Sequence, residues 1–111
     1  MAIGGQWTLH FDWGCRGSYN TSPITFNNNG TFTSAPYTGK WVQTDRMILF
    51  QFDQPPKTTY AGNTVENAMV GIMSTFAGGN GCWYAIKVGS TIAPVEEAKP
   101  EFDASGKKQD K

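Results

Sequence analysis

The stretch Trp7-Thr8-Leu9-His10-Phe11-Asp12-Trp13-Gly14-Cys15 alternates along its whole length between two kinds of residue. Every odd position is apolar or cysteine, and every even position is polar or glycine. A period of two is typical of a β-strand with one buried face. The pattern therefore predicts a first strand whose odd-numbered side chains point inward.

The same kind of pattern recurs at short intervals down to about Thr91 and predicts seven more strands. Asn and Gly separate these strands, and no window of about 12 residues has helical periodicity, so the fold class expected is all-β. The turn at 27–30 sets Phe32 opposite Phe26, and a turn at 44–45 sets Trp41 opposite Ile48. The later strands are expected at Ile24 and Phe26, at Phe32, at 38–43, at 47–52, at Tyr60 and Gly62, at 68–74 and at 82–88.

The composition changes after Thr91, where charged residues and proline replace the aromatic and β-branched residues. Such a segment buries too little apolar surface to offset the entropy lost on ordering. We therefore expect a β-barrel domain over residues 1–91 and a disordered C-terminal tail over residues 92–111. The tail is either a linker or anchor segment or a plain frayed terminus.

The two cysteines predict how the sheet closes. A meander of eight strands has two open edges unless its first and last strands pair. Cys15 ends the first strand and Cys82 begins the last, and these ends are neighbours in an antiparallel pair. We therefore predict a closed eight-stranded antiparallel up-and-down barrel with a Cys15–Cys82 disulfide, in which Trp13 lies opposite Tyr84. Two buried, reduced cysteines are the alternative.

The connections differ between the two ends of this barrel. Tight turns are expected at one end, at 28–30, 44–45 and 66–67, and longer links are expected at the other, at 14–18, 34–37, 53–57 and 75–81. The barrel should therefore be closed at one end and open at the other, like a cup. The glycines at 62 and 71 favour free space inside it, although the aromatic rings could equally fill the interior. The candidate ligand-binding residues near the looped end are Trp13, Arg16, Tyr19, Tyr37, Lys57, Tyr60 and Tyr84.

The tripeptide Gly5-Gln6-Trp7 resembles the G-x-W motif that opens the first strand in the calycin group, the lipocalins and avidins. The resemblance implies a small ligand-binding barrel in which Trp7 plugs the closed end. In lipocalins a basic residue lies against this Trp. Lys87 is the candidate here, although the strand pairing predicted above turns it outward, beside His10.

Several function classes are disfavoured by composition. Nine Lys plus Arg balance nine Asp plus Glu, which argues against nucleic acid or an anionic membrane as the main partner. No apolar run reaches the roughly 18 residues of a membrane span. The cysteines lack metal-ligand spacing, His10 is the only histidine, and no catalytic or phosphate-binding motif occurs, so we expect no metal, no cofactor and no catalytic residue.

These observations favour a non-enzymatic protein that holds a small, largely apolar ligand inside the barrel at its looped end. The first alternative is an interaction or inhibitor barrel that acts through its rim loops or an outer apolar face. If Met69 and Met73 face inward, Val70 and Ile72 face outward, which predicts a homo-oligomer through strands six and seven.

An enzyme such as a cyclase or isomerase is the second alternative. Its only candidate acids or bases are Arg16, Asp53 and Tyr84. A disulfide would imply an oxidising compartment, secreted or periplasmic, and reduced cysteines a cytoplasmic one.

Overall fold

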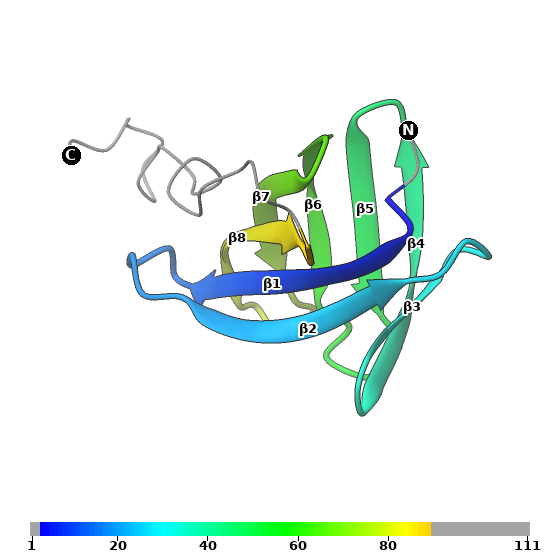
Figure 1. Ribbon diagram of the computed structural model, residues 1–111. Helices are drawn as coiled ribbons and strands as arrows, with labels where there is room; N and C mark the ends of the chain where they lie inside the picture. Colours follow the sequence, from blue (N-terminus) through cyan, green and yellow to red (C-terminus); the bar gives the residue numbers. More distant parts are fainter. Residues whose placement is uncertain (1–2, 90–111) are drawn as a thin grey trace.

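The computed structural model describes residues 3–89 of the chain. It confirms the all-β fold, a closed barrel in which each strand pairs antiparallel with its sequence neighbours (Figure 1). The predicted tail at 92–111 lies outside the described residues. The strands are β1 (Gly5–Trp13), β2 (Asn20–Phe26), β3 (Thr31–Ser34), β4 (Tyr37–Thr44), β5 (Met47–Phe52), β6 (Thr59–Val65), β7 (Ala68–Ser74) and β8 (Asn80–Lys87).

The barrel is closed by β1, which pairs with β2 along one edge and with β8 along the other. In Figure 1, β1 and β2 run side by side across the front while β4 and β5 run steeply behind them, as tilted strands of a barrel do. The predicted pairing of Phe26 with Phe32 is confirmed, and so is the turn at 66–67 that joins β6 to β7.

The predicted disulfide between Cys15 and Cys82 is present, with 5.1 Å between the two Cα atoms. The register that we derived from it is wrong, because Trp13 pairs with Gly81 and Cys82 pairs with Asp12. The ladder ends at Trp13. Residue 14 and Cys15 then take positive φ angles of 83° and 53°, and the Cys15 amide donates to the Asp12 carbonyl at 3.2 Å. The chain thus leaves the ladder before Cys15, and the disulfide joins Cys15 outside the ladder to Cys82 within it.

This shift of three residues exchanges the two faces of β8. Trp83 and Ala85 face the core, where the predicted register put Tyr84 and Ile86. Lys87 pairs with Trp7, and its Nζ lies 6.0 Å from the centre of the Trp7 ring, so the prediction that Lys87 turns outward is wrong. Tyr84 takes the outward place beside His10 instead.

Two smaller expectations also need correction. The loop between β4 and β5 is 45–46, so Trp41 lies opposite Phe50 rather than Ile48. A slip of two residues leaves every side chain on its predicted face, because the period is two. The expected longer link at 34–37 is a tight turn, in which Ser34 and Tyr37 still pair.

Aromatic rings fill the middle of the barrel. The Phe50 ring stacks on Tyr60 with 4.7 Å between their centroids and meets Trp83 edge-on at 5.2 Å. Both arrangements are preferred by aromatic pairs. The interior below the looped end is therefore a packed core, made by Ile3, Trp7, Leu9, Ile24, Phe26, Phe32, Ile48, Phe50, Tyr60, Met69, Met73, Trp83 and Ala85.

The two glycines expected to leave free space do not leave any. Gly62 pairs with Gly71, and both lie on the inward side of the sheet, between residues that belong to the core. A Cβ atom on Gly62 would lie 2.8 Å from the Cα of Gly71, and one on Gly71 would lie 2.7 Å from the Cα of Gly62. Their missing side chains let the backbones of β6 and β7 approach closely.

Candidate functional site

The hollow at the mouth of the barrel lies at the looped end and is open to solvent. Its volume is about 280 Å³. The inward side chains of β1, β2, β3, β5 and β6 form its inner wall, and the loop between β5 and β6 forms its outer lip. The lining residues are Leu9, Phe11, Ser22, Ser34, Tyr37, Phe52, Gln54, Pro55, Pro56, Thr58 and Tyr60.

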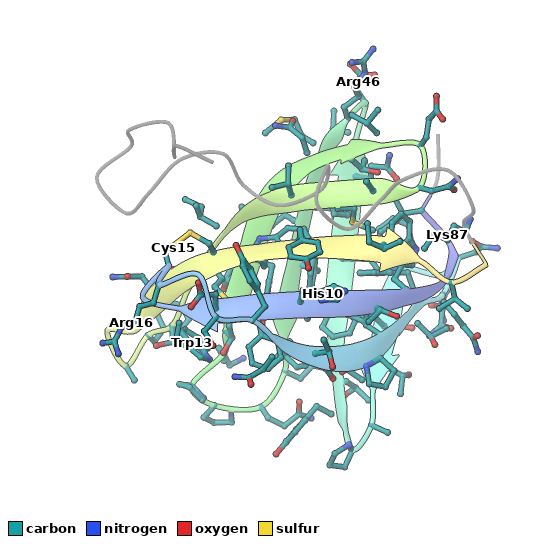
Figure 2. The ribbon with its side chains drawn as sticks, turned by 60° about the vertical axis from the view of Figure 1, so that its left-hand side comes forward. His10, Trp13, Cys15, Arg16, Arg46 and Lys87 are labelled. Carbon is teal, nitrogen blue, oxygen red and sulfur yellow. A yellow bond between two sulfur atoms is a disulfide. The ribbon has the colours of Figure 1, made fainter. Side chains whose placement is uncertain are left out.

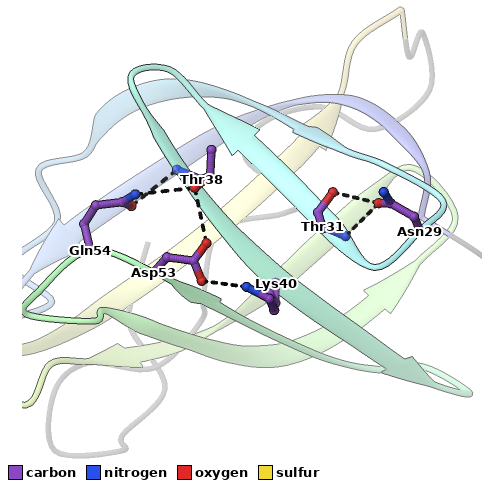
Figure 3. Close-up of polar contacts among 6 residues, drawn as sticks. All are labelled: Asn29, Thr31, Thr38, Lys40, Asp53 and Gln54. Atoms are coloured by element: carbon purple, nitrogen blue, oxygen red, sulfur yellow. Dashed lines mark hydrogen bonds and ion pairs between the residues drawn. The ribbon is translucent and has the colours of Figure 1, made fainter.

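A network of polar contacts braces the lip against β4 (Figure 3). Asp53 accepts hydrogen bonds from the Lys40 ammonium at 3.1 Å and the Thr38 hydroxyl at 3.2 Å. The Thr38 amide donates to the Gln54 side-chain oxygen at 3.3 Å. The hydrogen bond from Lys40 lowers the pKa of Asp53 below its ordinary value. These contacts hold Gln54 and the following Pro55 at the edge of the hollow.

Two serines form the polar part of the inner wall. The Ser34 hydroxyl donates to the Pro23 carbonyl at 2.8 Å, and the Ser22 and Ser34 oxygens lie 3.0 Å apart. A hydroxyl has one hydrogen, so Ser22 is the donor in the second bond. The lone pairs of the Ser22 oxygen then remain able to accept a hydrogen bond.

Tyr60 combines burial with an unused hydroxyl. The residue is 4% exposed, and its ring packs between Phe50 and Trp83. No hydrogen bond joins its hydroxyl to any other residue in the range 3–89. Burial raises the pKa of Tyr60 well above the ordinary tyrosine value, so its hydroxyl stays protonated at neutral pH. Tyr60 is therefore a neutral donor at the inner wall.

The structure brings two of the sequence-predicted ligand residues into this hollow, Tyr37 and Tyr60. Trp13, Arg16 and Lys57 are exposed and do not line it. Figure 2 shows Trp13, Cys15 and Arg16 together at the end of β1, with Lys87 at the opposite end.

The other two predicted residues, Tyr19 and Tyr84, lie on the outer face of the barrel. Tyr84 stacks on His10 with 4.3 Å between ring centroids, and Tyr19 meets Tyr84 edge-on at 5.0 Å. The inward position expected for Tyr84 is wrong because of the register shift of β8. Burial, helped by the nearby Asp12 and Tyr84, raises the pKa of Tyr19 to about 12.

The candidate acids and bases are dispersed. Asp53 pairs with Lys40 on the exposed side of the lip, Arg16 lies in the loop after β1, and Tyr84 is on the outer face. None of the three lines the hollow. Within residues 3–89 no group of three or more His, Cys, Asp or Glu side chains is placed to hold a metal ion.

Four polar residues of the hollow were absent from the sequence-based set: Ser22, Ser34, Gln54 and Thr58. The sequence does hold a signal for Ser22 and Ser34. Ser22 continues the inward series of Ile24 and Phe26 at a period of two, and Ser34 continues that of Phe32. Inward serines near the open end of a strand are candidates for ligand contacts.

Comparison with protein-family models, with curated proteins and with solved structures gives no match to this chain. Within residues 3–89, no helix is long and apolar enough to cross a membrane.

Proposed function

We propose that this barrel binds a small, largely apolar ligand in the hollow at its looped mouth, without catalysing a reaction. The observation that carries the proposal is an open hollow that lies above a packed core. Aromatic and aliphatic side chains wall it, and a few fixed polar groups converge on it. Small-molecule sites in proteins have this composition.

The size of the hollow limits the ligand. About 280 Å³ is near the lower end of the range for ligand pockets, roughly 300–1,000 Å³. It equals the liquid volume of roughly nine water molecules at about 30 Å³ each. A molecule of one or two rings fits this space, whereas a long lipid chain would extend into solvent.

Filling the hollow from within the barrel wall tests this function. We expect Ser22→Phe, which points a ring into the mouth, to weaken binding of an apolar fluorescent probe at least tenfold. Thr21→Phe is the matched control, because Thr21 is the preceding residue on β2 and points outward. Equal probe binding by the parent protein and by Ser22→Phe would contradict the proposal.

We also propose that this barrel is related to the calycin group. Two contacts support it. The Trp7 indole at the closed end donates to the Ile3 carbonyl at 2.8 Å, and the Lys87 ammonium lies over the Trp7 ring. The disulfide in turn supports an oxidising location, extracellular or periplasmic, because such bonds persist there.

A second candidate function is association with another copy of this chain through the outer face of β4 to β7. Val42, Leu49, Ala61 and Ile72 lie in one row across these strands, because each pairs with the next. Ile72 is 68% exposed, and Val42 and Leu49 are exposed as well. A row of apolar side chains on the outside of a sheet is typical of a protein interface.

Sedimentation velocity over a range of protein concentrations tests this association. We expect the parent protein to form dimers and Ile72→Glu to remain monomeric, because the substitution places a charge inside the apolar row. Thr33→Glu is the control, an exposed position on β3 away from the row. A parent protein that is monomeric at every concentration would exclude this function.

A further inference from the structure

Among residues 3–89, none of the side chains that line the mouth of the barrel carries a charge at neutral pH. Among its eleven lining residues the only titratable side chains are Tyr37 and Tyr60. The charged residues beside the lip in the sequence, Asp53 and Lys57, are exposed and outside the lining. A charged ligand would lose hydration on entering the mouth without gaining an opposite charge, which is costly.

The inner wall of the hollow offers both a hydrogen-bond donor and a hydrogen-bond acceptor. The Tyr60 hydroxyl has no hydrogen-bond partner among residues 3–89 and stays protonated. The Ser22 hydroxyl donates to Ser34, whose own hydrogen goes to the Pro23 carbonyl, so the Ser22 oxygen has lone pairs to spare. A ligand hydroxyl both donates and accepts, so its chemistry matches the Ser22 oxygen and the Tyr60 hydroxyl.

The apolar part of the lining favours a flat ring. Phe11, Tyr37, Phe52 and Tyr60 line the hollow, together with two prolines. The Tyr37 and Phe52 rings already meet edge-on at 6.3 Å. Aromatic walls of this kind stabilise an aromatic ligand through stacked and edge-on contacts beyond the burial of its area.

From these three observations we infer that the ligand class of this site is a neutral aromatic molecule with a hydroxyl group, of the phenol or naphthol type. This inference rests on the proposed binding function and deepens it. The ring fills the mouth of the barrel, and the hydroxyl joins the Ser22 oxygen to the Tyr60 hydroxyl.

Three probes of similar shape separate the possible ligand classes: 2-naphthol, 2-methylnaphthalene and 2-naphthoate. Their dissociation constants are measured on the full chain at neutral pH by amide chemical-shift titration. We expect 2-naphthol to bind at least about tenfold more tightly than either of the others, because two additional hydrogen bonds form and no charge is desolvated.

Two variants then show which residues bind the hydroxyl group of the ligand. Tyr60→Phe removes a hydroxyl that no residue in the range 3–89 uses, and Ser22→Ala leaves the Ser34 bond to Pro23 in place, so both should fold. Each should reduce the preference for 2-naphthol over 2-methylnaphthalene by about threefold to tenfold. Ser22→Phe should abolish binding of all three probes, which identifies the mouth as their site.

The outcomes distinguish this inference from the function on which it rests. If 2-naphthol and 2-methylnaphthalene bind equally well, the hydroxyl assignment is overturned while the binding function stands. A preference for 2-naphthoate overturns it too, since a cation outside the lining must then take part. If none of the three probes binds the parent protein, both the ligand class and the proposed function are excluded.

Discussion

Replacing Cys15 and Cys82 together by serine lowers the free energy of unfolding by about 4 kcal/mol, as expected for a cross-link between residues 67 apart. Without the cross-link the unfolded chain regains the conformational entropy that closing a long loop takes away. The folded barrel loses little in return, because Cys15 lies outside the β1–β8 ladder and residue 82 can keep its backbone pairing with Asp12. Chemical denaturation of parent and double variant measures the difference.

A thiol count on the denatured, unreduced protein is the companion experiment. Two free thiols would show that the bond does not form in the purified protein, and the variant should then be about as stable as the parent. If the bond is present and the double variant still unfolds within about 1 kcal/mol of the parent, the stabilising role assigned to it is wrong.

Truncating Trp83 to alanine should destabilise the barrel by about 4 kcal/mol, since large buried aromatics replaced by alanine typically lose 3–5 kcal/mol. Trp83 has no exposed surface, and it packs against both Phe50 and Tyr60. Its indole also donates to the Ile72 carbonyl at 2.9 Å. The substitution therefore leaves a cavity in the centre of the core and an acceptor without its donor.

Trp13→Ala is the matched control for this prediction. The same side chain is removed, but Trp13 is 40% exposed at the end of β1, so the loss should stay below about 1.5 kcal/mol. Denaturation curves of the two variants and the parent give the comparison. Similar losses in the free energy of unfolding for Trp83→Ala and Trp13→Ala would contradict the packed core below the hollow.

The number of strands, their order and the closure of the barrel could be predicted because alternation is strong where one face is polar. The buried Trp7 and Leu9 of β1 and the turn at 66–67 are examples, whereas Trp13 at the end of β1 is exposed. The register of β8 could not be predicted this way. Residues 82–86 are all apolar or cysteine, so a shift that exchanges the two faces of β8 changes little in the pattern.

The site was predicted only in part, for a related reason. The sequence places Arg16 and Lys57 in loops at the correct end of the barrel, but a loop sequence does not say in which direction its side chains point. Tyr60 could be found because it lies on a strand with a regular alternation. Gly14 is the residue in the sequence that indicates an end of β1 before Cys15, since glycine readily adopts the positive φ angle seen there.

The contact between Gly62 and Gly71 also constrains how this sequence can diverge. The obstacle to a side chain at either position is the main chain of the facing strand, which no substitution elsewhere can make smaller. A mutation at one glycine therefore cannot be compensated by a mutation at the other. We expect both positions to remain glycine in related chains that keep the barrel, while the surrounding residues change.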